Sequence, residues 1–327
     1  MCTGIRLKAQ DNSIIYARTL EFAQEINSEI IFIPRNYEFV GTDQSGKSNG
    51  LRWKTKYAVV GTNAEKQIGA IDGVNEKGLA GGLFYFSGYA QYQEVPADQN
   101  NNSIAPWELM TFILSTCDSV AQVKKILPTI YVNGASFAQW GITPPVHAVV
   151  HDEAGNSVVI EYVNGILHLY DNPLGVMTNA PTFDWHITHL STYINLGVFN
   201  DSSKELNGLT LKPLGQGSGM LGLPGDFTSP SRFVRAVVYS QSVIDIKDCQ
   251  TTKKTAFHIL NLFDIPRGFI RQREKDGVLY ERTQWTSACD LKNRRYYYKT
   301  YETQIVQEVD LLTMDMDSKQ TIIMPMK

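Results

Sequence analysis

The residue whose type and position most directly suggest chemistry is Cys2, which follows Met1. Aminopeptidases remove a methionine that precedes a small side chain, and this would leave Cys2 with a thiol and a free amine on one residue. Such an amine titrates at about 7.7–8.0, so it can act as the base for its own thiol near neutral pH. Arg18 is a candidate cation for stabilising the thiolate, and Glu21 could hold the amine by hydrogen bonding. The pattern is compatible with an N-terminal cysteine nucleophile, but taken alone it favours an ordinary cysteine near a chain end.

Arg232 also invites a chemical interpretation. If Ser229 caps a helix that opens with Pro230, Arg232 lies in the first turns, where the helix dipole disfavours a cation. A residue that breaks a local rule without evident gain often belongs to a functional site. The alternative is a salt bridge between Arg232 and Asp226.

The histidines give weaker indications of a metal or catalytic site. His147 and His151 share one face of a predicted strand, but spacing places no third ligand beside them, so we expect structural roles. His186 leaves a papain-type pair with Cys2 open. The chain has four cysteines, far apart and without a CxxC pair: Cys2, Cys117, Cys249 and Cys289. Neither a disulfide framework nor a metal site is expected, and a reducing, cytoplasmic location is.

Composition bounds the class of protein. The 327 residues are 43% hydrophobic, 11% aromatic and 19% charged, as in globular proteins. Thirty basic and thirty-three acidic residues give a net charge of −3, which argues against nucleic acid or an anionic membrane as the main partner. No stretch approaches the roughly 20 apolar residues of a membrane span, and polar residues interrupt the N-terminal region where a signal peptide would be apolar.

These side chains must be positioned by elements that the pattern predicts. The strongest hairpin signal spans 158–170, around Asn164-Gly165, and residues 72–79 read as strand, turn and strand into 81–86. Further strands are predicted at 14–18, 29–33, 56–60, 146–151, 174–178, 280–287, 294–300 and 304–309. Helices are predicted at 105–115, from 119, at 185–194, at 229–238 and at 253–264. This order favours an α+β fold of antiparallel sheets with helices outside them, in one continuous domain over residues 1–327.

Several motifs follow one another along nearly the whole chain: Cys2-Thr3, 31–37 (IFIPRNY), 72–79 (DGVNEKGL), 177–181 (MTNAP), 222–228 (GLPGDFT) and 231–233 (SRF). In this order they resemble the choloylglycine hydrolases, a family that includes conjugated bile salt hydrolases and penicillin V acylases. The resemblance implies an N-terminal nucleophile hydrolase fold, a four-layer α-β-β-α sandwich of two antiparallel sheets. It also implies that Cys2 lies at the end of a central strand. A homotetramer is implied as well, in which residues 193–222 reach onto a neighbouring subunit.

The resemblance also implies site residues. Cys2 is expected to attack an amide carbonyl without a cofactor, and Arg18 to stabilise its thiolate. Asn179 would aim its side-chain NH₂ at the oxyanion, although the sequence alone favours a turn-capping role ahead of Pro181. Arg18 matches the family position for stabilising the thiolate, and Arg232, which lies in the matched SRF motif, is also expected to belong to the site. Glu21 departs from the family pattern, because the family usually has Asp there, so its carboxylate lies on a stem one methylene longer.

The identity of the residue at position 85, here Tyr85, is expected to indicate the substrate class. Bile salt hydrolases generally have Asn at this position and penicillin V acylases Tyr, although a strand aromatic can also be ordinary core. Residues 17–19, 144–147 and 265–268 likewise resemble the penicillin acylase branch. We therefore expect an amidase acting on aryl- or acyl-acetamides of the penicillin V type. Conjugated bile salts and acylated homoserine lactones are the alternatives, with a non-catalytic binder of amphipathic ligands as an alternative of another class. Acyl selectivity is expected to depend on loops 22–27, 62–70 and 133–144.

Overall fold

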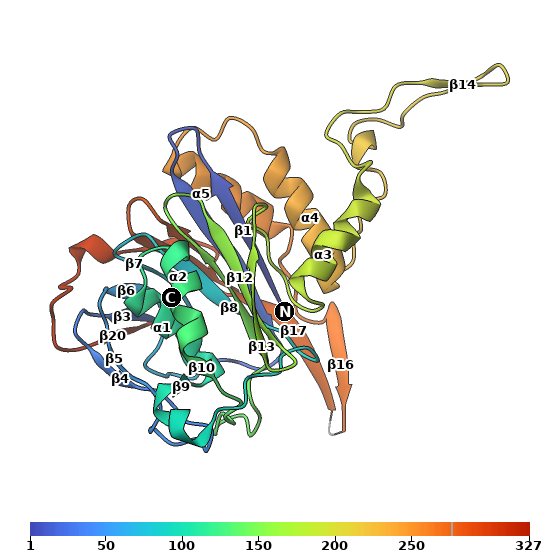
Figure 1. Cartoon of the computed structure of the whole chain (residues 1–327). Coiled ribbons are helices and arrows are strands. Elements are labelled where there is room, and N and C mark those ends of the chain that lie inside the picture. The colour runs from blue at the N-terminus through green and yellow to red at the C-terminus, as the bar shows by residue number, and fades with distance from the viewer. Residues whose placement is uncertain (276) are drawn as a thin grey trace.

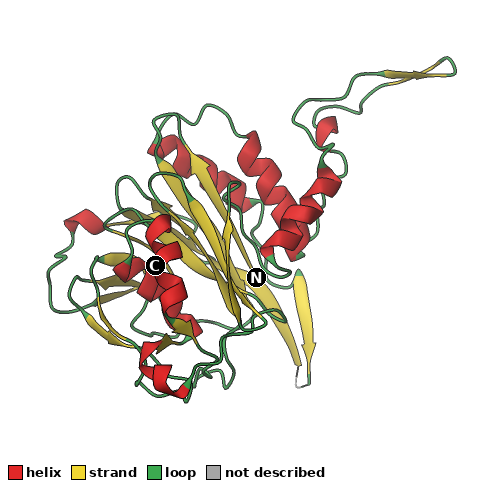
Figure 2. Cartoon of the chain, in the orientation of Figure 1, coloured by secondary structure: helices red, strands yellow, loops and turns green. Residues whose placement is uncertain are grey.

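Two antiparallel sheets lie face to face in the computed structural model, which describes residues 1–275 and 277–327 (Figure 1). The first sheet runs in the order β1-β2-β17-β18-β19, with β16 paired to β17. The second runs in the order β13-β12-β11-β8-β7-β6-β3-β20. Helices cover the outer face of each sheet. Figure 2 shows the resulting helix–sheet–sheet–helix arrangement, which confirms the predicted α+β sandwich.

The first sheet consists of β1 (Cys2–Lys8), β2 (Ile14–Phe22), β16 (Ile270–Glu274), β17 (Gly277–Asp290), β18 (Arg295–Thr300) and β19 (Gln307–Asp310). The second consists of β3 (Glu29–Ile33), β6 (Val59–Thr62), β7 (Asp72–Asn75), β8 (Ala80–Tyr85), β11 (Val146–His151), β12 (Ser157–Val163), β13 (Ile166–Asp171) and β20 (Ile322–Pro325). Three small pairs are formed by β4 (Glu38–Val40) with β5 (Arg52–Lys54), β9 (Ser103–Ile104) with β10 (Tyr131–Val132), and β14 (Lys204–Leu206) with β15 (Leu209–Leu211).

The helices divide between the two outer layers. They are α1 (Leu109–Thr116), α2 (Val120–Ile126), α3 (Phe183–Leu190), α4 (Ser229–Ser242) and α5 (Cys249–Asn261). Short 3₁₀ turns lie at Ala97–Asn102, Pro106–Glu108, Leu127–Thr129, Ser191–Tyr193, Ser218–Met220 and Leu311–Thr313. On the first sheet, α4 packs against β1, and α5 against β2 and β17. On the second, α1 packs against β7 and β8. Within the described residues, no helix has the length and apolar character that crossing a membrane requires.

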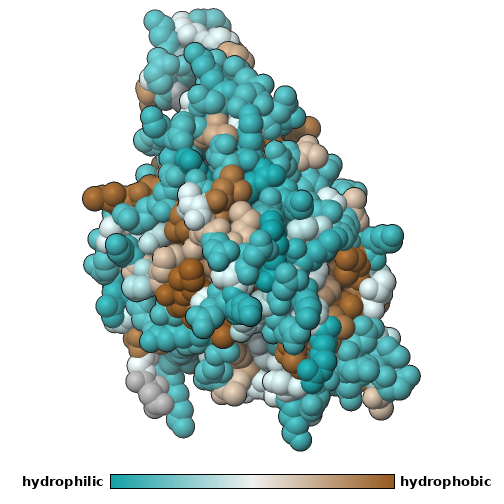
Figure 3. Space-filling view, turned by 90° about the vertical axis from the view of Figure 1, so that its left-hand side faces the viewer, coloured by the Kyte–Doolittle hydropathy of each residue, from teal (hydrophilic) through white to brown (hydrophobic). Residues whose placement is uncertain are grey.

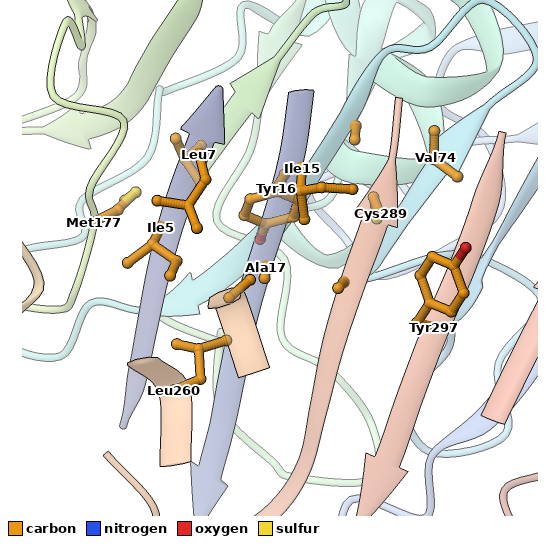
Figure 4. Packing of buried hydrophobic residues seen from close by; sticks show 14 of the residues in the cluster. Ile5, Leu7, Ile15, Tyr16, Ala17, Val74, Met177, Leu260, Cys289 and Tyr297 are labelled. Atoms are coloured by element: carbon orange, nitrogen blue, oxygen red, sulfur yellow. The ribbon is translucent and has the colours of Figure 1, made fainter. Parts of the chain in front are cut away.

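Strand β2 is buried on both faces because it lies between the second sheet and α5. Successive side chains of a strand point to opposite sides, so Tyr16 and Ala17 enter different layers of the core. Figure 4 shows Ala17 beside Leu260 of α5, with the neighbouring β1 side chains Ile5 and Leu7 in the same cluster. Apolar packing on both sides fixes the register of the β1–β2 hairpin, which determines where Cys2 and Arg18 meet.

Several sequence predictions are confirmed by the strand bounds. Strands 29–33 and 146–151 coincide with β3 and β11. The predicted hairpin is formed by β12 and β13, with Asn164 and Gly165 at φ 52° and 75° in its two-residue turn. These positive φ values are the conformation that an Asn-Gly turn accommodates.

Two predictions about strands are wrong. Residues 174–178 form no strand: the segment contributes one bridge, between Met177 and Gly4, after a turn in which the Asn172 side chain accepts from the Gly175 amide. The central position expected for Cys2 is also incorrect, since β1 is the edge strand of its sheet. The Met177 segment covers that edge, with Gly4 and Met177 exchanging hydrogen bonds of 2.8 and 3.0 Å.

Residues 193–222 project away from the body as an arm that ends in the β14–β15 hairpin (Figure 1). Its large apolar side chains are unusually exposed, with Ile194 at 88%, Phe199 at 86% and Leu221 at 81%. The face seen in Figure 3 is mostly hydrophilic and carries its hydrophobic residues in small separate groups. Because these arm side chains are exposed in the single chain, their burial requires a partner surface.

Candidate active site

Cys2 and Arg18 meet through the register of the β1–β2 hairpin. Cys2 lies opposite Leu20 and Gly4 opposite Arg18, so Cys2 and Arg18 are diagonal neighbours on one face of the sheet. The Arg18 Nη2 donates to the Cys2 Sγ at 2.7 Å, and both side chains are buried. Gly4 is required here, because a Cβ at this position would lie 2.7 Å from the Phe84 ring. The Arg18 guanidinium stacks on that ring, with its Cζ 4.1 Å from the ring centroid.

The Asn179 side chain connects three parts of the site. Its Oδ1 accepts from the Cys2 backbone nitrogen at 2.9 Å and from the Arg232 Nη2 at 2.7 Å. Its Nδ2 donates to the Tyr85 carbonyl at 2.7 Å. Two donors on one end and an acceptor on the other fix the orientation of the amide. An amide nitrogen carries two N–H groups, and the Tyr85 carbonyl is the one acceptor of Nδ2 among the described residues.

Arg232 extends from α4 to the start of β1. It is fully buried and donates to the Cys2 carbonyl, to the Thr3 Oγ1 at 2.8 Å and to the Phe227 carbonyl at 2.9 Å. Burial lowers the pKa of its guanidinium, and the attraction of Glu21 and Cys2 acts in the other direction. The Asp226 carboxylate accepts from Thr228 and Ser231 instead, so the salt bridge considered as the alternative is not what holds Arg232.

Glu21 lies beside the start of the chain. Its backbone pairs with that of Met1, and the Met1 amine lies 3.8 Å from the Glu281 Oε2. The Glu21 Oε1 accepts from Thr283 at 3.2 Å, while its buried Oε2 has no partner among the described residues. Burial raises the pKa of Glu21, an effect opposed by the chain's terminal amine and by Arg232. A β-bulge between Thr283 and Trp285 lies beside it, as bulges often do at active sites.

A pocket opens at Cys2, with an empty volume of about 1200 Å³ that includes its mouth. Aromatic side chains form much of its wall: Phe22, Phe39, Trp53, Phe84, Tyr85, Trp107, Phe137 and Trp140. The Tyr85 ring meets Phe22 edge-on at 5.5 Å, and Phe22 stacks on Trp140 at 5.6 Å. Tyr85 thus lies on the pocket wall rather than in the core. No Lys or Arg occurs among the described residues that line the pocket.

The three loops expected to control selectivity all contribute to this pocket, and Glu65 joins them. Its backbone nitrogen donates to the Ile26 carbonyl at 2.7 Å, and its carboxylate accepts from Asn27 at 3.4 Å and from the Trp140 Nε1 at 3.0 Å. Glu65 and its neighbour Lys66 have φ of 52° and 56°, an unfavourable region for these residues. The pocket wall is therefore one connected unit.

Sequence reasoning missed one support of Asn179 and one of its neighbour Thr178. The His186 Nε2 donates to the Asn179 carbonyl at 2.8 Å, and burial lowers the pKa of His186 to about 4, so the ring is neutral. This contact replaces the papain-type pairing that the sequence left open. His147 bonds Glu161 at 3.1 Å and the Thr178 carbonyl at 3.2 Å, which is a structural role, as expected. Spacing alone could not have related these side chains to Asn179 or Thr178.

Comparisons with known proteins agree with this geometry. Residues 2–324 match the family described as "Linear amide C-N hydrolases, choloylglycine hydrolase family". The chain is 34% identical over 322 residues to a bile salt hydrolase/transferase of Clostridium perfringens, covering 98% of this chain and 95% of the relative. It is 26% identical over 321 residues to a penicillin V acylase of Pectobacterium atrosepticum, covering 91% and 77%.

The fold agrees as well. The solved structure of the C2A mutant of a conjugated bile acid hydrolase from C. perfringens superposes with a TM-score of 0.88 at 30% identity, covering 100% of this chain and 97% of that one. The family match spans almost the entire chain, and these relatives cover between 91% and 100% of it. The chain therefore belongs to the choloylglycine hydrolase family of linear amide C–N hydrolases.

Proposed function

We propose that this amide hydrolase uses Cys2 as its nucleophile and the Cys2 α-amine as its base, once Met1 has been removed. The observation that carries the proposal is the Cys2 thiol, 2.7 Å from the Arg18 guanidinium at the base of an aromatic pocket. The thiol sulfur attacks the amide carbonyl and its proton passes to the amine. The resulting ammonium protonates the leaving amine as the C–N bond breaks. Water then hydrolyses the thioester, with the amine again acting as the base.

The surrounding side chains have separate roles in this proposal. Arg18 stabilises the thiolate, and the free N–H of the Asn179 amide stabilises the tetrahedral oxyanion. Arg232 holds the Cys2 carbonyl and the Asn179 oxygen, so it positions both reacting groups. Glu21 has one unpartnered, buried oxygen beside Met1, and we assign it to the ammonium that removal of Met1 would create.

For the substrate we propose a flat aromatic acyl group of the penicillin V type. Support comes from the Tyr85–Phe22–Trp140 series of rings beside Cys2, because such rings stack on a planar acyl group. Conjugated bile salts are the second candidate, since a relative at 34% identity is named for them. Comparing kcat/KM for penicillin V, glycocholate and taurocholate distinguishes the two candidates.

Replacing Tyr85 by asparagine provides the sharper test of the acyl group. We expect Tyr85→Asn to lower kcat/KM for penicillin V by about 2–10-fold, the loss of ~0.5–1.5 kcal/mol of stacking, and to leave bile salt hydrolysis equal or higher. Tyr89→Asn is the matched control, because Tyr89 is exposed and lies outside the pocket. A parallel fall for both substrates would mean that Tyr85 only supports the wall.

We also propose that residues 1–327 act as one domain in the cytoplasm and assemble as a homotetramer through residues 193–222. The four buried free thiols are typical of a reducing compartment. The arm can be removed cleanly, because the Gly197 amide donates to the Gly219 carbonyl at 2.9 Å across its base. Replacing residues 198–218 by a short glycine linker should give a smaller species in sedimentation. Leu262→Ser, at an exposed leucine outside the arm, should leave the assembly unchanged.

A further inference from the structure

Asp72, the first residue of the DGVNEKGL motif, belongs to the facing sheet yet approaches the site from behind Arg18. Its Oδ1 lies 3.9 Å from the Arg18 Nη1, whose guanidinium bonds the Cys2 sulfur through Nη2. The thiol and the carboxylate thus lie at two ends of one buried cation. All three side chains are at most 4% exposed, so solvent screens their charges weakly.

Burial raises the pKa of Asp72, whereas Arg18 and the hydrogen bonds that the carboxylate accepts act in the other direction. Tyr16 donates to its Oδ1 at 3.1 Å, and Ser287 and Tyr296 donate to its Oδ2 at 2.7 and 2.8 Å. Three hydroxyl donors and a guanidinium favour the charged form over a protonated one. Each hydroxyl projects from a strand of the first sheet, so these hydrogen bonds link the Asp72 carboxylate of the second sheet to the first.

The missing side chain of Gly82 leaves the space for this arrangement. A Cβ there would lie 2.6 Å from the Asp72 Oδ1, 2.6 Å from the Tyr16 hydroxyl and 2.8 Å from the Arg18 Nη1. Contacts below 3.0 Å force a shift of the neighbouring atoms. The close approach of Arg18 to Asp72 is thus built into strands β7 and β8.

We propose that Asp72 is a positioning residue that holds Arg18 against Cys2 and balances its charge, and that it thereby sets the pH range in which Cys2 ionises. This inference rests on the proposed role of Cys2. When the thiol is neutral, Asp72 pairs the Arg18 cation; when the thiolate forms, Arg18 is shared between two anions. The carboxylate therefore opposes ionisation of Cys2 while keeping the guanidinium in place.

Other charged or titratable groups also face these side chains. Around Cys2 they are its own amine, Glu21 of β2, Arg232 of α4 and Glu281 of β17. Around Asp72 they are Tyr16, Tyr296 and Cys289, and burial raises the pKa of each of these well above its usual value. Those three groups are neutral at ordinary pH, so removing the Asp72 charge changes the balance on that side of Arg18 by one unit.

The test is the pH dependence of Cys2 alkylation by iodoacetamide in mature protein, read by mass spectrometry. In Asp72→Asn the pH of half-maximal alkylation should fall by about 1 unit, the scale of one nearby charge, and the acid limb of kcat/KM should move with it. Asp290→Asn is the matched control, since it removes a buried carboxylate of β17 that caps a turn. An unchanged midpoint in folded Asp72→Asn would overturn the proposal.

Thermal unfolding provides a second test, which holds even if Asp72→Asn folds poorly. Arg18→Met leaves Asp72 as an unpaired buried anion, whereas Arg18→Met with Asp72→Asn leaves no such charge. The Tm of the double variant should therefore fall by less than the sum of the decreases in Tm of the two single variants. Strict additivity of these decreases would overturn the pairing of Arg18 with Asp72. If Cys2 of the parent protein is not alkylated preferentially, the proposed nucleophile itself fails, and with it the control of its ionisation.

Discussion

Replacing Cys2 with serine is expected to reduce kcat by about 10⁴–10⁶-fold, the range seen when a nucleophile or its activating partner is lost. A serine hydroxyl stays protonated at neutral pH, so Arg18 would have no thiolate to stabilise. Mature protein should begin at Cys2 in an intact-mass measurement. Protein that retains Met1 should be as inactive as the serine variant, because a peptide nitrogen cannot accept the thiol proton.

Alkylation provides the control for this prediction. Burial raises the pKa of Cys117 to about 11, so iodoacetamide at neutral pH should modify Cys2 first and abolish activity. Cys117→Ser should keep its turnover, since Cys117 lies at the C-terminal end of α1, away from the pocket. Full turnover by protein carrying Met1 would refute the mechanism, and an inactive mature protein would favour a binding role for the fold.

The second large effect is expected at Asn179. Asn179→Ala should lower kcat by about 10²–10³-fold, the usual cost of one oxyanion donor, with a smaller change in KM. Asn179→Asp separates the two ends of the amide, because it keeps the oxygen that Cys2 and Arg232 bond but loses the donor NH₂. We expect both variants to be impaired in kcat, measured with the fastest of the three substrates.

Asn172→Ala is the matched control for Asn179. Asn172 is a buried asparagine of the same segment whose side chain only closes the turn, bonding Gly175 and Val176. Its loss should lower Tm while kcat stays within a few fold. If Asn179→Ala instead unfolds like a turn variant and Asn179→Asp turns over normally, the amide serves the backbone and not the oxyanion.

Local patterns allowed much of the fold to be predicted. The Asn164-Gly165 hairpin and strands 29–33 and 146–151 depend on turn chemistry and β-branched runs that the sequence displays directly. The segment 174–178 shows the limit, because it has strand-like residues but follows a turn closed by the Asn172 side chain and forms only one bridge, between Met177 and Gly4. Whether an apolar run becomes a strand depends on a partner edge, which a local pattern does not contain.

The residues of the site likewise divide into those that local patterns predict and those that they do not. Cys2, Arg18 and Glu21 lie on one hairpin, so their proximity follows from register. Asn179 and Tyr85 were expected at the site only from the family resemblance, and Arg232 also from its place in the first turns of a helix. The structure brings all three to Cys2. His186 and the Asp72 carboxylate were not predicted to contact site residues, because these contacts arise where α3 and the second sheet meet the first hairpin. Such contacts depend on how layers stack and leave no period or spacing in the sequence.

The bonds of Glu65 to Ile26, Asn27 and Trp140 have a consequence for how substrate range can change. A substitution in any one loop alters the support of the other two, so its effect on selectivity depends on which residues the others already hold. New acyl preferences should therefore arise through combined changes in loops 22–27, 62–70 and 133–144. A search that varies one loop at a time would discard substitutions that are beneficial only together.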